Sequence, residues 1–417
     1  MIFNCFSIIM ISGMKKHCLN DIREDRKKTK RNHIIELFRL KQKLSKIEVR
    51  RLSGYSLSTI ISVFNYLINA KIIIPAGIEE KNIPGRKCTY YRLAREKFLY
   101  LGITFVQTEM LSVLVSLSGD IISSRHDDIP LKINQESFLK LMSRHLEKMA
   151  GENSRLLVNI QNIGFAMPGR IENGLLVAYS FMPFLKNVDF TDLAKRIFPK
   201  KRIYLDNNIS SFLSYFLSDR QLTGKYPKVI VLSLRTGPAM GFIYQGRIVT
   251  EYGEIGHCSA GREARPCVCG RKDCLDTYLS HHALTRDIQN ICPGGRTTEQ
   301  SDEENIPFKE IVNLYNTVPA VKKLLDLRFG QLGNVLLDVI NILNPDLVIL
   351  SGELFGCFSD PAAGMRHLIE SEQRDTGIIA NFKKAELIYK NLPADTAALG
   401  ICYRMIKEDF DYRKEIF

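Results

Sequence analysis

The most informative part of this chain is residues 254–280, EIGHCSAGREARPCVCGRKDCLDTYLS. One histidine is followed at +10, +12 and +17 by three cysteines, and Pro266 and Gly270 supply turns that let these side chains converge. The four residues are His257, Cys267, Cys269 and Cys274. One imidazole and three thiolates form a closed set that suits tetrahedral Zn²⁺ and leaves no coordination position for a substrate. We therefore expect a structural zinc site, with a chance cluster or a disulfide pair as the alternatives.

The cysteines indicate a reducing compartment, and the N-terminus has the features of neither a membrane span nor a signal peptide. The chain has 417 residues, enough for about three domains. Its ten cysteines include seven outside the metal set, and these seven have no disulfide-framework spacing, so we expect a cytoplasmic location. The apolar residues 1–11 are too short to span a bilayer, and Lys15 and Lys16 follow them instead of preceding them as in a signal peptide. We expect no membrane partner, and Met14 is a second candidate for the translation start.

The charge is concentrated in the first quarter of the chain. Residues 1–98 contain 21 Lys and Arg against 8 Asp and Glu, which accounts for the whole formal excess of +13. Such an asymmetry indicates a polyanion-binding module joined to a neutral one. A solvated basic tail explains residues 23–31, and we expect residues 1–29 to be disordered. It does not explain the patterned segment after residue 31.

That segment belongs to residues 30–97, which have the pattern of a winged helix-turn-helix. A first helix is expected to bury one face, carried by Ile34, Ile35, Leu37, Phe38 and Leu40. A second helix is predicted over residues 46–52 and, after a Ser-Gly-Tyr-Ser turn, a third over residues 57–69. The third helix is expected to bury Ile60, Ile61, Phe64, Leu67 and Ile68. Two helices joined by a tight glycine turn are typical of DNA-binding proteins.

Residues 72–74, a loop and the stretch 84–93 predict two strands that flank a basic turn and complete a wing. Small polar side chains on the third helix suit base edges, and cations at the wing tip suit phosphate or the minor groove. The expected DNA contacts are Ser56, Ser58, Thr59, Ser62, Asn65, Arg86 and Lys87. A winged helix used for protein contacts is the alternative interpretation.

From residue 98 onward the pattern is α/β. Strands are predicted at residues 99–106, 111–117, 156–166, 201–205, 229–234 and 347–350, and helices at residues 137–149, 192–197 and 329–343. Polar residues and glycines come directly after several of these strands, which is where ligands bind in open α/β sheets. A polar surface loop is expected over residues 290–304.

These residues resemble the ROK family of repressors, open reading frames and kinases, and in particular its repressor branch. The resemblance covers residues 30–410. It is carried by the metal segment and by Pro168-Gly169-Arg170, Asp206-Asn207-Asn208, Thr236-Gly237 and residues 344–352. It implies an actin-like ATPase (ribonuclease H-like) fold of two α/β lobes over residues 98–417, with a sugar cleft between the lobes, preceded by an α+β winged helix-turn-helix domain.

The positions that a kinase of this family needs are changed. The family's Asp-x-Gly-Gly-Thr phosphate loop corresponds here to Thr104-Phe105-Val106-Gln107-Thr108, and the second phosphate loop keeps only part of its glycine pattern at residues 235–241. The catalytic Asp of the family corresponds to Asn208, whose amide cannot accept a proton as a carboxylate does. A shifted alignment would instead place Asp206 there. No catalytic residue is therefore expected.

The sugar-binding positions of the family are better kept. By resemblance they are Gly169, Arg170, Asn207, Asn208, Gly237, Glu254, His257 and Asp276. Amides and carboxylates form paired hydrogen bonds with vicinal hydroxyls. Asp276 stands where the family has Glu, and Glu254 and Asp276 have a second possible role as partners that orient the metal-bound His257.

The preferred hypothesis is a cytoplasmic, sugar-responsive transcriptional regulator, a repressor of carbohydrate-utilisation genes, that binds a double-stranded operator as a homodimer or tetramer. Two rival hypotheses are an ATP-dependent sugar kinase of the same family and a sugar-sensing scaffold that contacts another protein.

Overall fold

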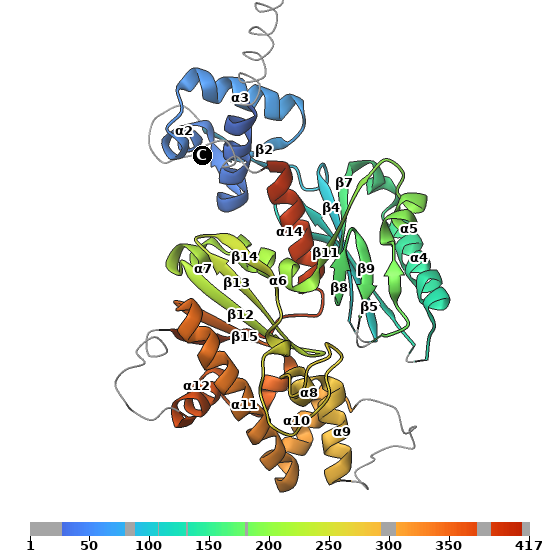
Figure 1. Cartoon of the computed structure of the whole chain (residues 1–417). Coiled ribbons are helices and arrows are strands. Elements are labelled where there is room, and N and C mark those ends of the chain that lie inside the picture. The colour runs from blue at the N-terminus through green and yellow to red at the C-terminus, as the bar shows by residue number, and fades with distance from the viewer. Residues whose placement is uncertain are drawn as a thin grey trace, which may run out of the picture.

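The computed structural model describes residues 27–79, 88–106, 108–130, 132–179, 182–292, 306–372 and 385–410. Two five-stranded sheets dominate it, with the strand orders β11-β7-β4-β5-β6 and β14-β13-β12-β15-β16. In each sheet the first three strands in chain order form an antiparallel meander. The fourth strand pairs in parallel with the first, and the fifth pairs in parallel with the fourth. One topology is therefore used twice, which gives two lobes (Figure 1).

Lobe 1 is built on β4 (Leu99–Val106), β5 (Glu109–Ser116), β6 (Ile121–Asp128), β7 (Ile160–Met167) and β11 (Arg202–Asn207). Helices α4 (Gln135–Glu152) and α5 (Phe190–Ile197) cover one face of this sheet, and a small sheet of β8 (Arg170–Glu172), β9 (Leu175–Ala178) and β10 (Lys186–Val188) lies beside it. Phe105, Phe138 and Phe165 are fully buried in the core between them.

Lobe 2 is built on β12 (Lys228–Leu234), β13 (Pro238–Tyr244), β14 (Arg247–Gly253), β15 (Leu347–Ser351) and β16 (Glu386–Tyr389). Its outer face is covered by α9 (His281–Ile291), α10 (Phe308–Thr317), α11 (Pro319–Leu343) and α12 (Pro361–Glu372). The short α7 (Arg220–Lys225), α8 (Asp276–Leu279) and three 3₁₀ turns, Ser154–Asn159, Ile255–His257 and Glu353–Cys357, complete the two lobes.

Two helices cross between the lobes. After the last strand of lobe 1, α6 (Asn208–Ser218) packs on β13 and β14 of lobe 2; after the last strand of lobe 2, α14 (Thr396–Phe410) packs on β4 and β7 of lobe 1. Glycine makes this approach possible, because a Cβ at Gly400 would lie 1.8 Å from the Ser211 carbonyl oxygen and one at Gly102 would lie 2.0 Å from that of Ala398. The lobes are thus joined by reciprocal helix packing.

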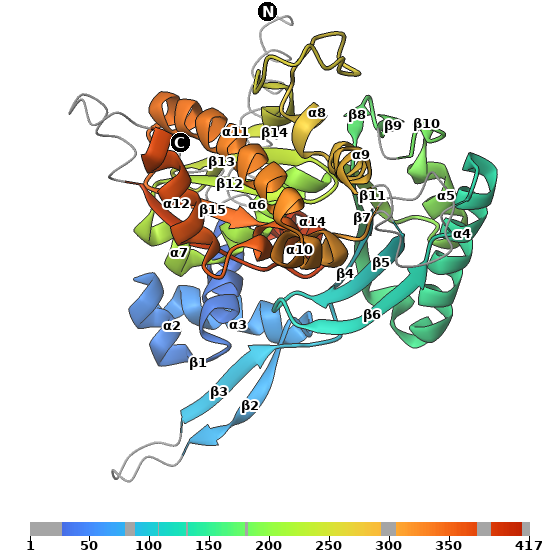
Figure 2. The same ribbon diagram turned by 90° about the horizontal axis from the view of Figure 1, so that it is seen from below.

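The N-terminal region consists of a helix over residues 27–41, α2 (Lys46–Ser53), α3 (Leu57–Asn69) and a sheet of β1 (Lys43–Ser45), β3 (Cys88–Leu93) and β2 (Ile73–Glu79). Strands β2 and β3 project from the body as a wing (Figure 2). Ser45 and Glu48 form a capping box on α2, and Gly54 adopts φ 70° between the two helices, a left-handed conformation that favours glycine. The predicted helix-turn-helix and wing are confirmed.

This region, called here the winged helix, shares one hydrophobic core with lobe 1 and α14. Phe38 and Phe64 belong to the same buried cluster as Val113 of β5 and Met405 of α14. The winged helix is therefore packed into the same core as lobe 1 and α14.

The fold class expected from the sequence is confirmed, but several details are wrong. Residues 154–159 form a 3₁₀ turn in place of the start of a strand, because Val158 is 79% exposed and the chain must turn from α4 into β7. Helix α11 begins at Pro319, ten residues before the predicted start, and Pro suits the first turn of a helix. The third strands β6 and β14 and the crossing helices α6 and α14 were not predicted.

Burial in the winged helix also differs from expectation. Ile61 is 43% exposed, not buried, and Val63 takes its place in the core because it lies on the same face of α3 as Ile60, Phe64 and Leu67. Leu40 is 40% exposed near the end of its helix. Across the part of the chain that the structure describes, no helix is long and apolar enough to cross a membrane.

Candidate ligand cleft and metal centre

The four predicted metal ligands converge. One ligand atom from each of His257, Cys267, Cys269 and Cys274 lies within 4.8 Å of all the others. Cys267 Sγ is 3.5 Å from His257 Nδ1, and Cys269 Sγ is 3.6 Å from Cys274 Sγ. A tetrahedral ion with bonds of about 2.3 Å to sulfur and about 2.0 Å to nitrogen separates such pairs by about 3.5 and about 3.8 Å. The donor set fits a closed site for one metal ion.

Local backbone bonds shape the loop that carries the thiols. The Cys267 N–H donates to the Arg271 carbonyl at 2.9 Å, and Gly270, at φ 86°, closes the turn by donating to the Cys267 carbonyl. The backbone N–H of Arg271 lowers the pKa of the exposed Cys269, whereas burial raises the pKa of Cys274 to about 12. A cation is thus needed to hold all three sulfurs as thiolates at neutral pH.

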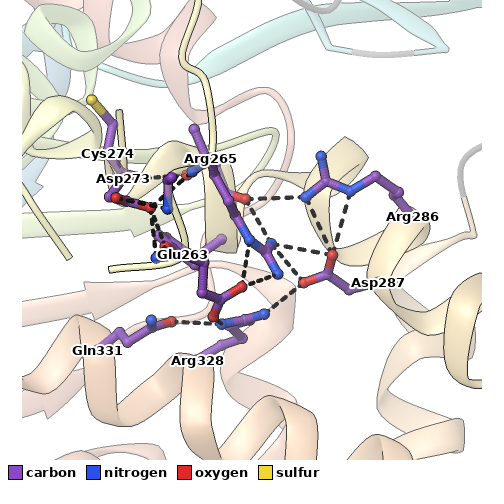
Figure 3. A network of polar contacts seen from close by, with 11 residues as sticks. Glu263, Arg265, Asp273, Cys274, Arg286, Asp287, Arg328 and Gln331 are labelled. Atoms are coloured by element: carbon purple, nitrogen blue, oxygen red, sulfur yellow. Dashed lines mark hydrogen bonds and ion pairs between the residues drawn. The ribbon is translucent and has the colours of Figure 1, made fainter. Parts of the chain in front are cut away.

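A polar network fastens the metal-binding segment to lobe 2 (Figure 3). The Arg265 guanidinium donates to Asp287 Oδ2 on α9 at 2.8 Å and to Glu263 Oε2 at 2.8 Å. Arg328 of α11, only 3% exposed, reaches the same two carboxylates at 2.8 and 3.1 Å. Asp273 accepts bonds from the backbone N–H groups of three successive residues, 263–265. The segment is therefore held by charged contacts to two helices.

The sugar-binding positions predicted in lobe 2 form one group beside the metal ligands. Because Nδ1 of His257 faces the sulfurs, its Nε2 points away from them and lies 4.0 Å from Glu254 Oε2. Asp276 lies next to both: burial raises its pKa, Glu254 adds to the rise, and His257 opposes it. A Cβ at Gly237 would lie 2.6 Å from Asp276 Oδ1. Residues distant in the sequence thus meet at the metal ligand.

The positions predicted in lobe 1 form a second group. Asn207 Nδ2 donates to the Gly169 carbonyl at 2.8 Å, and Asn207 Oδ1 caps α6 by accepting from the Ile209 N–H. Gly169 adopts φ 93°, and a Cβ there would lie 2.4 Å from the Ala178 carbonyl oxygen. Arg170 is exposed and pairs with Glu172 at 3.1 Å.

A cavity of about 270 Å³ lies between the two lobes. It is lined by residues of both lobes: Val106, Thr108, Glu109, Pro168, Tyr179, Asn208, Arg235, Thr236, Pro307, Phe308, Lys309, Gly352, Glu353, Asn391, Leu392 and Ala394. Of the predicted sugar contacts only Asn208 lines it, but Pro168 and Thr236 are sequence neighbours of two others. Tyr179 bridges the lobes, because it lies against Gly169 and its hydroxyl contacts Thr236. An interlobe cleft with convergent polar groups is a typical small-molecule site.

Sequence reasoning missed Arg235, which occupies the second phosphate loop. Its guanidinium is largely buried, donates to the Leu392 carbonyl at 2.8 Å and lies 5.0 Å from the centre of the Phe212 ring. Burial lowers its pKa. The signal was present in the sequence, since Arg235 is the first residue of the stretch 235–241, which keeps only part of the glycine pattern.

The two positions considered for a catalytic carboxylate have other roles. Asp206 is 6% exposed; it accepts a hydrogen bond from Ser210 Oγ at 2.8 Å and pairs with Arg404 of α14. Thr104, at the Asp position of the first phosphate loop, is fully buried, and its Oγ1 donates to the Ala166 carbonyl at 2.6 Å. Neither side chain is directed to the cleft by these contacts.

The predicted DNA contacts lie on one side of α3. Ser58, Ser62 and Asn65 are exposed, and Thr59 is half-buried. The Ser56 hydroxyl caps the helix and contacts both Ser58 and Thr59 at 3.0 Å. The wing-tip cations, Arg86 and Lys87, lie outside the described residues. Two exposed apolar side chains on the same face, Leu57 and Ile61, were not predicted.

Comparison with known proteins agrees with this architecture. The family model described as "ROK family" matches residues 100–385, and the chain belongs to that family. A xylose repressor of Caldicellulosiruptor bescii is 22% identical over 386 residues, which cover 88% of this chain and 92% of the repressor. An N-acetyl-D-glucosamine kinase of Shigella boydii is 29% identical over 214 residues, which cover 46% of this chain and 65% of the kinase.

Among solved structures, a ROK family transcriptional regulator described as a homologue of the E. coli MLC protein superposes with a TM-score of 0.72. The superposition covers 93% of this chain and 97% of the other at 18% identity, so it supports the fold alone. That fold is the predicted actin-like, two-lobed one preceded by a separate N-terminal region.

Proposed function

We propose that this chain is a sugar-responsive transcriptional repressor of carbohydrate-utilisation genes. The observation that carries the proposal is the extent of the similarity: the relatives named xylose repressor align over 88–89% of this chain, whereas the N-acetyl-D-glucosamine kinase aligns over 46% of it. In this proposal residues 30–97 bind the operator and residues 98–417 bind the sugar.

The sugar-kinase domain works without phosphoryl transfer in this proposal. A kinase needs a carboxylate within reach of the attacking hydroxyl and close backbone approach to the phosphates. Here the cleft presents Asn208 at the position of the family's catalytic Asp, and Asp206, the carboxylate of the shifted alignment, is paired with Arg404. Val106, in the first phosphate loop, lines the cavity with a bulky side chain where the family has glycine. The rival kinase hypothesis keeps the support of the kinase relatives alone.

The metal is Zn²⁺ in this proposal, and its role is structural. Three thiolates and one imidazole are a soft donor set and match tetrahedral zinc. Bound zinc would fix the His257 ring, so that Nε2 stays beside Glu254 and Asp276 in the orientation a sugar hydroxyl needs.

The packing supplies a route from sugar to DNA. Asn207 and Asn208 begin α6, α6 packs on α14, and α14 shares a core with the winged helix. A sugar that closed the cleft and displaced Asn208 would shift α6 against α14. The response requires that the sugar bind one arrangement of the lobes more tightly than the other.

The repressor acts in the cytoplasm as a homodimer or tetramer on a roughly palindromic operator, since one helix-turn-helix reads only one half-site. The test is DNA binding by the full-length, zinc-loaded protein, with D-xylose and N-acetyl-D-glucosamine tried first as effectors. Operator affinity in the nanomolar range that changes at least about tenfold with one sugar supports the proposal. Sugar-dependent release of ADP from ATP, or absence of DNA binding at low salt, would overturn it.

A further inference from the structure

The outward face of α3 is partly apolar. Leu57 and Ile61 expose 52% and 43% of their surface, and Asn65 comes next at the same spacing of four residues, so the three form one stripe. Ser58 and Ser62 run beside this stripe and are also exposed. Leu57 and Ile61 lie in the N-terminal half of the helix, which is the part that a recognition helix directs to base edges, and Asn65 follows one turn later.

Helix α3 itself carries no charge, while its surroundings are strongly basic. Its thirteen residues, LSTIISVFNYLIN, include no Lys, Arg, Asp, Glu or His. Residues 27–79 and 88–93 contain 12 Lys and Arg against 3 Asp and Glu. Arg50 and Arg51 are exposed at the end of α2, and the Arg31 guanidinium lies 3.6 Å from the centre of the Tyr66 ring, at the rim of the same face. Cations for phosphate thus frame a neutral reading surface.

The chemistry of the major groove limits what such a surface can read. Guanine is read best by Arg or Lys, and the amino group of cytosine by Asp or Glu; α3 offers neither type of side chain. The thymine 5-methyl is the apolar group of the groove, and adenine N6 and N7 suit an amide. The side chains present match A·T pairs and leave G·C pairs without a specific partner.

We infer that α3 selects A·T pairs, and that Leu57 and Ile61 determine this specificity by contacting thymine 5-methyl groups while Asn65 faces adenine. The inference rests on the proposed function, because it requires that α3 enter the major groove. It goes beyond the proposed function by stating that the operator half-site contains A·T pairs under α3 and by naming the side chains that select them.

The experiment begins with sites selected from random DNA by the full-length protein. We expect A·T pairs at the positions covered by α3. In a second probe each thymine of those positions is replaced by uracil, which lacks only the methyl group. Wild-type affinity should fall about fourfold for each buried methyl group that the uracil probe lacks, as expected for burial of one such group.

Variants assign the effect to the two side chains. Leu57→Ala/Ile61→Ala should bind the thymine and uracil probes equally well. Ile47→Ala is the matched control, because Ile47 is also an exposed isoleucine, 72% exposed, but lies on α2; it should discriminate between the probes as the wild type does. All three positions are exposed, so circular dichroism should show unchanged folding.

Two outcomes separate this inference from the proposed function. Selected sites rich in G·C under α3, or equal wild-type affinity for thymine and uracil probes, would overturn the inference and leave a DNA-binding repressor. Full discrimination by the double variant would also overturn it. Failure to select any DNA would overturn the proposed function itself.

Discussion

The two lobes share one sheet topology but differ in the connection after the third strand. In lobe 1, β6 ends at Asp128 and α4 begins at Gln135. In lobe 2, β14 ends at Gly253 and the equivalent long helix, α11, begins only at Pro319. The intervening segment carries the metal ligands, α8, α9 and α10. The two lobes therefore share a scaffold, and the predicted metal ligands lie in a segment that is inserted in lobe 2 alone.

The lobes also differ in what their polar residues do. Lobe 2 uses charged groups, Glu263, Arg265, Asp287 and Arg328, to fasten the insertion. Lobe 1 buries a Ser112–His145–Asp127 chain, with His145 Nε2 2.9 Å from Ser112 Oγ and Nδ1 2.6 Å from Asp127 Oδ2. This set resembles a hydrolase triad, but Ser112 is only 1% exposed, so it is a structural contact. Charged contacts thus fasten the insertion of lobe 2, whereas the polar chain of lobe 1 holds α4 to its own sheet.

Loss of a metal ligand should produce the largest difference in response between the two lobes. Cys269→Ser should lose the bound metal ion and raise backbone hydrogen exchange over residues 261–273, because none of these residues is buried in the hydrophobic core. The sheet of lobe 1 should keep its protection. Metal content and exchange are measured by mass spectrometry. Cys258→Ser, a change beside His257 but outside the ligand set, is the control and should keep one ion per chain; a Cys269→Ser variant that also kept it would refute the metal assignment.

The polar network predicts the next largest effect. Asp287→Asn should lower the free energy of unfolding by about 3 kcal/mol, because it leaves Arg265 and Arg328 without their shared carboxylate. Urea unfolding measures this change. Asp128→Asn in lobe 1, at a side chain 94% exposed, should change stability by less than about 0.5 kcal/mol. Equal effects of the two changes would contradict the role given to the network.

The network also sets an acid limit. Burial opposes ionisation of Asp287, but hydrogen bonds from Arg265 and Arg328 outweigh it and hold the pKa of Asp287 below its usual range. A carboxylate whose pKa is lower in the folded than in the unfolded state stabilises the fold at every pH above the unfolded pKa, which is about 3.9 for Asp. That stabilisation is lost as the pH falls from the unfolded pKa through the folded pKa. The contribution of Asp287 should therefore disappear only below about pH 4, and Asp287→Asn should show a flatter stability profile there.

The crossing helices give a test at the junction of the lobes. Gly400→Ala should destabilise the protein by about 2 kcal/mol, because the new Cβ meets the Ser211 carbonyl of α6. Gly330→Ala, in α11 with no atom within 4 Å of the added Cβ, should stabilise it by about 0.5 kcal/mol. Thermal unfolding measures both. In the proposed repressor, Gly400→Ala should also weaken the sugar response; an unchanged fold and response would show that α6 and α14 are not coupled as the packing indicates.

The smallest effect is expected from His145. Burial lowers its pKa, and its hydrogen bond to Asp127 only partly restores it, with Arg125 opposing protonation. The unfolded chain therefore binds a proton near pH 6.5 that the folded chain resists, so stability should fall by about 1 kcal/mol from pH 7 to pH 5. Urea unfolding of wild type and His145→Gln over this range measures it. An equal slope in both proteins would assign the effect to other groups.

Much of the fold was readable from the sequence where the pattern is local. The caps of α2 and α3, the apolar faces of the winged helix and the hairpin of β4 and β5 all depend on spacings of two to four residues. The His/Cys cluster was equally readable, since its four residues lie within 18 consecutive positions and three thiols with one imidazole are typical of a structural zinc site. Helix α14 was not predicted, although Ala398, Ile401, Cys402 and Met405 have the helical spacing that indicates one buried face.

The sequence by itself determined many of the elements, the resemblance to the family and the His/Cys cluster, because each of these depends on neighbours along the chain. Only the tertiary structure decided that α6 and α14 exchange lobes, that Asp206 is paired with Arg404 in place of serving as a base, and that Ile61 faces outward. These facts depend on residues brought together from distant parts of the chain: Arg404 lies 198 positions from Asp206, and no local spacing encodes that meeting.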